Sequence, residues 1–195
     1  GSAANALALA QVARPGGVVF CHAGSHIRVD EAGGPEFLAG CRLHGIDGPG
    51  GKIAPAALSA AIDRYPADAV HHGRPMAVSI SELTEAGSDY SPAETAAIAE
   101  IGRRAGLPLH VDGARFANAL EGTGATAAAL TWRSGVDMLS FGATKNGCLA
   151  AEAVVFFDRG LAEGFAFQRK RAGHLFSKSR FVAAQFAAYL DGGHY

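Results

Sequence analysis

Lys145 stands in a loop of small residues, Ser140-Phe-Gly-Ala-Thr-Lys-Asn-Gly147, which follows a short apolar run. Glycines in such a loop allow the backbone to approach a bulky ligand closely. An amine that is held out of water loses its proton more readily and can attack an aldehyde as a nucleophile. Lys145 is therefore a candidate nucleophile, and a solvated loop lysine is the alternative interpretation.

Asp112 lies in the stretch His110-Val-Asp-Gly-Ala-Arg115, at the end of a predicted strand. A carboxylate in this place could face the ring nitrogen of pyridoxal phosphate (PLP), because the protonated ring is the better electron sink. An aspartate at a strand end, followed by Gly-Ala and by a lysine loop 33 residues later, is the arrangement expected in the large aminotransferase-like PLP fold. Asp112 could instead cap the helix that follows. Together the two motifs favour PLP as the cofactor.

Two further segments could bind anionic groups. Arg115 follows three residues after Asp112, and its guanidinium matches the carboxylate of an amino-acid substrate in bidentate fashion. A surface salt bridge is the alternative for this residue. Gly1 and Ser2 open a predicted helix, and helix N-termini bind phosphate through their free N–H groups and dipole. Ser2 could equally serve only as the N-cap.

His22 and His26 are separated by four residues, a spacing that also occurs in metal sites. No third ligand can be named from the sequence, and no helix is evident in this segment. We therefore expect no metal site. An imidazole stacked on the cofactor ring is the preferred interpretation for one of the two histidines.

The composition is that of an ordinary globular protein, with 195 residues, 49% apolar and 18% charged residues, and a net charge of −1. A charge so close to zero gives no broad attraction to nucleic acid or to an anionic membrane. No apolar run is long enough for a membrane span, and no secretory signal is visible. Three widely spaced cysteines form neither a zinc pattern nor a disulfide framework, so we expect a cytoplasmic location.

Short apolar runs alternate with helical patterns along the chain. The patterns predict helices over residues 3–12, 55–65, 92–105, 161–171 and 180–190, and strands over residues 18–21, 77–81, 109–111, 138–140 and 153–157. This alternation predicts an α/β fold with a mainly parallel sheet flanked by helices. Ligands bind at the carboxyl ends of parallel strands, so Asp112 and the Lys145 loop should lie at the same edge of the sheet.

The chain resembles the low-specificity L-threonine aldolases, which are PLP-dependent enzymes of the β-eliminating lyase group. Five stretches carry the resemblance in the expected order: residues 1–5 (Gly-Ser-Ala-Ala-Asn), 26–34 (His-Ile-Arg-Val-Asp-Glu-Ala-Gly-Gly), 110–115, 140–147 and 152–156 (Glu-Ala-Val-Val-Phe). The resemblance covers nearly the whole chain and implies the fold of the type I PLP enzymes.

The resemblance also implies a role for each matched residue. Lys145 would hold PLP as a Schiff base, and Asp112 would pair with the pyridine nitrogen. His26 would stack on the ring, and Arg115 would bind the substrate carboxylate. The phosphate group would be held by three residues that offer backbone N–H groups or hydroxyls, Gly1, Ser2 and Thr144.

One position departs from the family pattern. Many members carry a histidine, in a Thr-His-Asn stretch, that contacts the substrate hydroxyl, whereas residues 84–87 here read Thr-Glu-Ala-Gly, so Glu85 takes its place. The departure leaves open both the preference for the β-substituent and the identity of the base. His26 is the first candidate for the base, and Glu85 is the second.

The implied reaction is the retro-aldol cleavage of L-threonine, L-allo-threonine or related β-hydroxy-α-amino acids, such as phenylserine, to glycine and an aldehyde. Residues 1–195 would form the PLP-binding large domain, without an N-terminal segment and the small C-terminal domain of the family. The resemblance also implies a homodimer or homotetramer. Two alternatives stay open: another reaction of a type I PLP enzyme, such as β-elimination or transamination, and an inactive fragment that keeps the fold.

Overall fold

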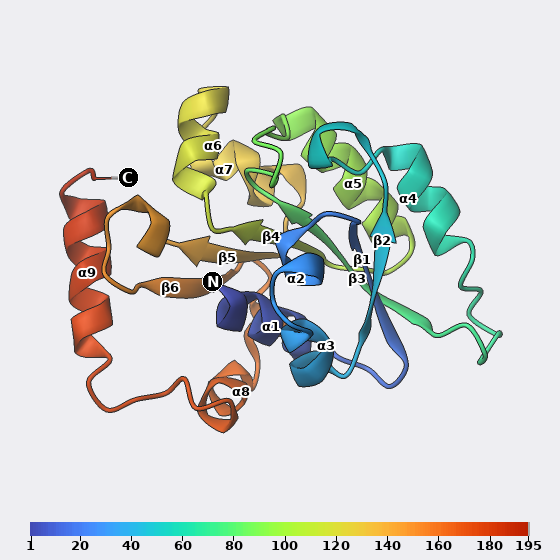
Figure 1. Cartoon of the computed structure of the whole chain (residues 1–195), viewed down its shortest axis with the longest axis horizontal. Helices are drawn as coiled ribbons and strands as arrows, with labels where there is room; N and C mark the ends of the chain where they lie inside the picture. Colours follow the sequence, from blue (N-terminus) through green and yellow to red (C-terminus); the bar gives the residue numbers. More distant parts are fainter. Residues whose placement is uncertain (195) are drawn as a thin grey trace.

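The computed structural model describes residues 1–194 and contains one six-stranded sheet with the order β2-β1-β3-β4-β5-β6 (Figure 1). The strands are β1 (Gly17–His22), β2 (Arg42–Ile46), β3 (Arg74–Ser81), β4 (Leu109–Gly113), β5 (Met138–Gly142) and β6 (Glu152–Phe156). Strands β1 to β5 run parallel, and β6 is antiparallel to β5. The expected α/β fold with a mainly parallel sheet is therefore confirmed.

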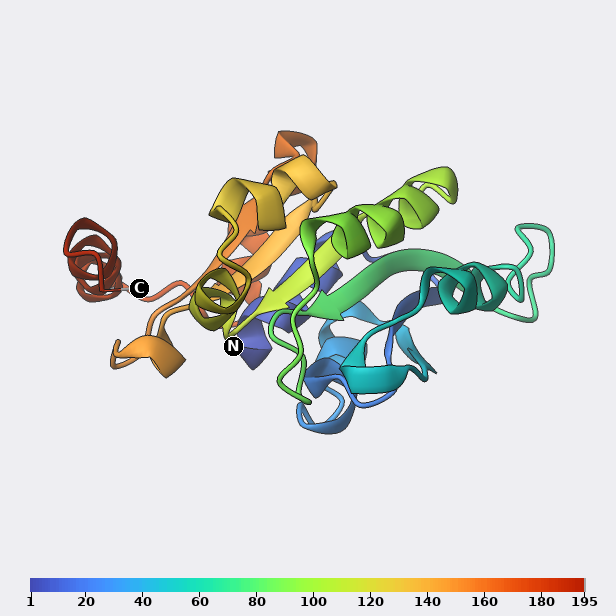
Figure 2. The same cartoon turned by 90° about the horizontal axis from the view of Figure 1, so that it is seen from above.

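Helices cover both faces of this sheet (Figures 1 and 2). One face carries α4 (Pro55–Ile62), α5 (Pro92–Arg104), α6 (Phe116–Thr123) and α7 (Ala127–Leu130), and the other carries α1 (Ser2–Gln11), α2 (His26–Val29) and α3 (Gly34–Ala39). The chain continues after β6 into α8 (Phe165–Arg171) and α9 (Arg180–Asp191). No helix in residues 1–194 has both the length and the apolar character that a membrane span needs.

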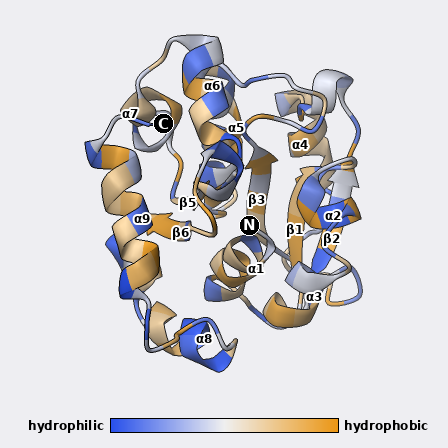
Figure 3. Ribbon diagram, turned by 60° about the vertical axis from the view of Figure 1, so that its left-hand side comes forward, coloured by the Kyte–Doolittle hydropathy of each residue, from blue (hydrophilic) through white to orange (hydrophobic). Residues whose placement is uncertain are grey.

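Strand β1 shows why the short apolar runs become buried strands. Val18 and Phe20 point into the core below α4 and α5, whereas Val19 and Cys21 point into the core below α1 and α3. A strand that is buried on both faces needs apolar side chains at every position, because successive side chains alternate between the faces. The hydrophobic colours along β1 and β3 in Figure 3 follow from this arrangement.

Helix α1 begins one residue earlier than expected. Gly1 occupies the N-cap position, Ser2 is already helical, and no side chain caps this end. The interpretation of Ser2 as the N-cap is therefore wrong. Residues 4–10 of the helix are all buried, which fits its alanine- and leucine-rich sequence.

The predicted helix over residues 161–171 is interrupted. A 3₁₀ turn (Arg159–Ala162) comes first, and α8 starts only after Gly164, whose φ of 76° lies in the left-handed region. Glycine adopts this conformation without steric cost, so it ends one element and lets the next begin in a new direction. The structure also contains β2, α2, α3, α6 and α7, none of which the periodicity predicted.

Helix α9 packs against the loop that carries Lys145. Its Tyr189 forms a small core with Ala143 and Ala151, the residues on either side of the loop. The side-chain oxygen of Gln185 accepts a hydrogen bond from the Ala150 N–H at 3.1 Å. The C-terminal helix therefore supports the Lys145 loop.

Candidate active site

The carboxyl edge of the sheet brings together Asp112 and the Lys145 loop. Asp112 pairs with Ser140 of the parallel strand β5, and Lys145 follows Ser140 by five residues. This confirms that both residues lie at the same edge. Lys145 is exposed in a 3₁₀ turn (Thr144–Asn146), and its amine makes no hydrogen bond or ion pair with another described residue.

Asp112 is buried, and each of its carboxylate oxygens accepts one hydrogen bond. Oδ1 accepts from the Ala114 N–H at 3.1 Å, and Oδ2 accepts from Nδ2 of Asn5 at 2.9 Å. The following helix, α6, has Arg115 at its N-cap position, so Asp112 does not cap it. Within residues 1–194, no lysine or arginine forms an ion pair with Asp112, which leaves a buried carboxylate open to a cationic partner.

Asn5 and Glu31 complete a hydrogen-bond network around Asp112. The Asn5 amide donates both to Asp112 and, at 2.9 Å, to Oε1 of Glu31. The same Glu31 oxygen lies 3.0 Å from Nδ1 of His26. Asn5, Glu31 and Asp112 are buried, and the His26 side chain is 30% exposed. No role was predicted for Asn5 or Glu31, although Asn5 is the only polar residue in positions 3–10.

His26 lies at the first position of α2, so the expectation of no helix in its segment is wrong. Its ring nitrogen and the carboxylates of Glu31 and Asp112 place three potential metal-ligand atoms within 4.8 Å of one another. However, the Asn5 Nδ2 group donates hydrogen bonds to both carboxylates, and an N–H donor in this place opposes a cation. The group is therefore better described as a hydrogen-bond network.

His22 does not take part in this network. Its Nδ1 accepts a hydrogen bond from the Gly24 N–H at 3.0 Å, so its Nε2 donates to the Gly48 carbonyl at 3.1 Å. Both nitrogens of His22 are thus used by the backbone, and His22 and His26 do not form a metal pair.

His110 lies two residues before Asp112 and faces the same side of β4. Its two ring nitrogens are hydrogen-bonded to the hydroxyls of Ser79 at 2.9 Å and Ser140 at 2.8 Å. The ring is fully buried, and this burial lowers the pKa of His110, so the ring is neutral at pH 7. A Ser-His-Ser bridge thus ties β3, β4 and β5 together next to the candidate site.

The start of α1 reaches the same edge of the sheet. The backbone nitrogen of Gly1 lies 3.3 Å from Oε2 of Glu152, which pairs with Gly142 at the end of β5. Gly1 and Ser2 are exposed there. Thr144 is also at this edge, and its hydroxyl closes the lysine loop by accepting from the N–H of Ala151 at 3.1 Å.

Arg115 and Glu85, both expected at the substrate, contact each other. Nη1 of Arg115 lies 3.9 Å from Oε1 of Glu85, and both side chains are partly exposed. A partly exposed pair at this distance is weak. The Arg115 guanidinium therefore remains accessible to a stronger carboxylate ligand.

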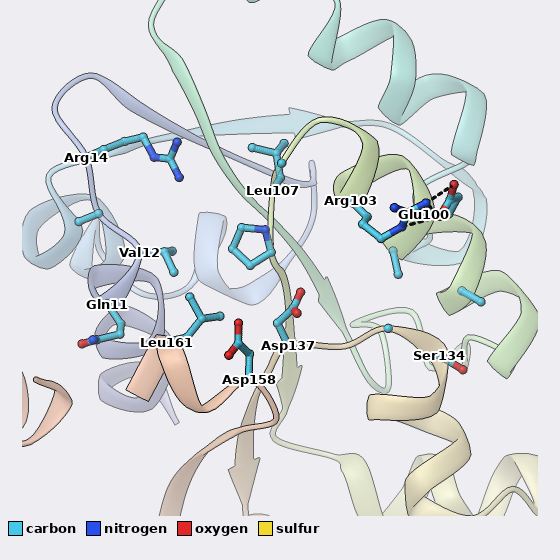
Figure 4. A pocket seen from close by; sticks show the side chains of 16 residues that line it. Gln11, Val12, Arg14, Glu100, Arg103, Leu107, Ser134, Asp137, Asp158 and Leu161 are labelled. Atoms are coloured by element: carbon cyan, nitrogen blue, oxygen red, sulfur yellow. Dashed lines mark hydrogen bonds and ion pairs between the residues drawn. The ribbon is translucent and has the colours of Figure 1, made fainter. Parts of the chain in front are cut away.

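A cavity of about 720 Å³ lies at the opposite edge of the sheet (Figure 4). It is lined by residues that precede β1, β4 and β5, among them Arg14, Leu107 and Asp137. Burial raises the pKa of Asp137, whose carboxylate accepts a hydrogen bond from the Leu109 N–H at 2.8 Å. None of the candidate site residues lines this cavity, so its position does not match the site.

The family model of the β-eliminating lyases matches residues 1–194. A low specificity L-threonine aldolase from a Pseudomonas species is 43% identical over 195 residues, which are 99% of this chain and 56% of that relative. A second one, from Pseudomonas aeruginosa, is 42% identical over 98% of this chain and 55% of that relative. The solved structure of Leishmania major threonine aldolase has a TM-score of 0.88 and 28% identity over 97% of this chain and 55% of that one.

This structural similarity confirms the expected fold of the type I PLP enzymes. The chain spans slightly more than half the length of the relatives that it matches.

Proposed function

The chain belongs to the β-eliminating lyase family, and we propose that it acts as a PLP-dependent aldehyde-lyase. The substrates would be L-threonine, L-allo-threonine or related β-hydroxy-α-amino acids, and the products glycine and an aldehyde. The proposal extends to this chain the name of the two Pseudomonas relatives, low specificity L-threonine aldolase. Residues 1–195 would serve as the PLP-binding domain of this enzyme.

The observation that carries the proposal is the buried Asp112 carboxylate, which has no cationic partner among residues 1–194 and lies at the same edge as Lys145. A buried carboxylate needs a cation or hydrogen-bond donors, and a protonated pyridine nitrogen would add a positive charge and one N–H donor to the two hydrogen bonds that Asp112 already accepts. The first turn of α1 offers free N–H groups at this edge for a phosphate. The residues present therefore fit PLP.

When bound, PLP supplies an electron sink for the carbanion that is left when the Cα–Cβ bond breaks. Lys145 would hold the cofactor covalently through its amine. Arg115 would bind the substrate carboxylate in place of the weakly paired Glu85, which fixes the orientation of the substrate. His26, or in second place Glu85, would accept the proton of the β-hydroxyl group.

The proposal is tested by adding PLP to the purified chain and recording the absorbance of the lysine-bound cofactor. We expect a yellow band that is absent from Lys145→Ala and present in the control Lys170→Ala, which removes an exposed lysine of α8. With threonine or phenylserine, the loaded protein should release glycine and an aldehyde without a keto-acid acceptor.

Two results would contradict the proposal in different ways. A chain that stays colourless with PLP would favour the inactive fragment. A coloured protein that transfers amino groups only in the presence of a keto acid would instead be an aminotransferase. We further propose that the protein forms a homodimer or homotetramer. Size-exclusion chromatography with light scattering measures the molar mass of the assembly directly.

A further inference from the structure

Glu31 is a buried carboxylate to which neither the family resemblance nor the reaction assigns a role. We propose that Glu31 is a positioning residue that holds His26 directly, and Asp112 through the Asn5 amide, in the orientations that the site requires. In this arrangement Glu31 also fixes the proton of His26 on Nδ1. The inference rests on the proposed function where it concerns the cofactor, and it deepens that function.

The direction of the hydrogen bonds around Asn5 follows from its neighbours. Both Glu31 and Asp112 present carboxylate oxygens, which only accept, at 2.9 Å from the same atom of Asn5. That atom must be the amide nitrogen, because its two hydrogens serve one carboxylate each. The amide oxygen of Asn5 is buried and has no hydrogen-bond partner within residues 1–194. The orientation of the Asn5 amide therefore serves the two carboxylates and leaves its own oxygen without a hydrogen bond from the described residues.

The protonation of His26 follows by the same reasoning. Oε1 of Glu31 accepts at 3.0 Å, so Nδ1 of His26 carries the hydrogen. In the neutral ring, Nε2 is then the nitrogen with a free lone pair. The Glu31 side chain is fully buried, whereas that of His26 is 30% exposed. Glu31 thus holds the ring from its inner side, and a ring so held can stack or accept a proton.

Stability alone does not account for Glu31. Its Oε2 atom is buried without a hydrogen-bond partner in the described part of the chain. A buried acceptor that is left unsatisfied destabilises the folded state, because it loses its hydrogen bonds to water. Buried charged groups are also often replaced by apolar side chains without loss of stability. A function for the Glu31 carboxylate explains why the fold accommodates this cost.

Two variants separate the hydrogen bonds of Glu31 from its charge. Because Oε1 receives both bonds and Oε2 none, a glutamine can place its oxygen at the first position and its amide nitrogen at the second. Glu31→Gln therefore keeps both hydrogen bonds, whereas Glu31→Ala removes them. Glu121→Ala, which removes an exposed glutamate of α6, is the control.

The first measurement is ¹⁵N NMR of the His26 imidazole in the chain without added PLP. We expect the Nδ1-protonated form in the unaltered chain, in Glu31→Gln and in Glu121→Ala, and its loss in Glu31→Ala. If Glu31→Ala leaves the Nδ1-protonated form unchanged, the proposed role toward His26 is overturned. This measurement does not depend on the proposed enzymatic activity.

The second measurement is the PLP affinity, from titration of the absorbance of the bound cofactor. Glu31→Ala should weaken the affinity by about tenfold, which corresponds to about 1.4 kcal/mol, and Glu31→Gln should weaken it less. Asn5→Ala should weaken the affinity while the His26 proton stays on Nδ1, because only the link to Asp112 is cut. This variant also tests the network if Glu31→Ala does not fold.

The outcomes distinguish this inference from the proposed function. If the unaltered chain binds no PLP, the proposed function fails, and the NMR measurement still decides the role of Glu31 toward His26. If PLP binds equally well to the unaltered chain, Glu31→Ala and Asn5→Ala, the positioning role toward Asp112 is refuted. Addition of Zn²⁺ is the last control. If Zn²⁺ shifts the His26 resonances of the unaltered chain but not those of Glu31→Ala, the group is a cation site and not a hydrogen-bond network.

Discussion

Glu82 gives the sharpest prediction for the stability of this fold. It follows the last residue of β3, is only 2% exposed, and both of its carboxylate oxygens accept from the N–H of Tyr90 at 3.2 Å. Burial raises the pKa of Glu82 from 4.5 to about 8, with a smaller contribution from the charge of Asp89. The folded protein therefore keeps a proton on Glu82 at pH 7 that the unfolded chain releases.

This difference in proton binding sets the sign of the pH dependence. Between pH 4.5 and about 8 the folded state binds one more proton at Glu82 than the unfolded state does. The free energy of unfolding therefore falls as the pH rises through this range. At 1.36 kcal/mol per pH unit, the span of about 3.5 units lowers the free energy of unfolding by at most about 5 kcal/mol. Water that enters around the ionised carboxylate makes the actual loss smaller.

Glu82→Gln removes the titration and keeps an acceptor for the Tyr90 N–H. The free energy of unfolding of the variant, relative to that of the unaltered chain, should be higher at pH 8.5 than at pH 5 by more than about 1 kcal/mol, because most of the loss from Glu82 falls between these two pH values. Urea unfolding between pH 5 and 8.5, followed by the fluorescence of Trp132, measures both values. Glu121→Gln, at an exposed position, should show no such difference. If the free energies of unfolding of Glu82→Gln and the unaltered chain differ by the same amount at pH 5 and at pH 8.5, the predicted titration of Glu82 is refuted.

Three further predictions concern other parts of the molecule. Because burial lowers the pKa of His110, the unfolded chain takes up a proton at this residue first, and stability should fall as the pH drops below about 6.5; His110→Gln should flatten this acid limb in the same urea experiment. Ser91→Ala removes the capping box that Ser91 forms with Glu94 at the start of α5, and thermal unfolding should show a loss of about 1 kcal/mol, with no loss disproving the role of the cap. Glu85→Ala frees Arg115 and should lower the KM for threonine severalfold with kcat unchanged; a collapse of kcat would instead identify Glu85 as the base.

The elements that the sequence predicted are those with a local signal, either a uniformly apolar run or clear boundary residues. The apolar run of β1 and the helix between Pro92 and Gly106 were recognisable, because a strand buried on both faces is uniformly apolar and a helix is bounded by proline and glycine. Strand β2 (Arg42–Ile46) was not recognisable, because it lies at the sheet edge, is mostly partly exposed and mixes charged with apolar residues. Helix α2 has only four residues, too few for any periodicity.

Some residues of the candidate site could likewise be predicted from the sequence, and others could not. Asp112 and Lys145 stand out because each comes at or after the end of a short apolar run and has small residues close by, a pattern that is local in the sequence. The partnership of Asn5 with Asp112 joins residues 107 positions apart and exists only because α1 packs across β4 and β5. Glu31 follows Asp30 and precedes alanine and glycines, so nothing local separates it from a surface acid. Its burial results from the packing of α1 beside α2.

Helix α1 therefore contributes to the site twice. Its first turn lies at the carboxyl edge of the sheet, where its free N–H groups suit a phosphate, and Asn5 lies about one turn further along and orients Asp112. Four residues of α-helix span about 6 Å, so one rigid element sets the spacing between the proposed phosphate end and the proposed ring-nitrogen end of the site. The burial of residues 4–10 fixes the rotation of α1 on the sheet. The alanine-rich sequence of this helix thus has a functional consequence, because close packing of small side chains holds the amide of Asn5 between two carboxylates.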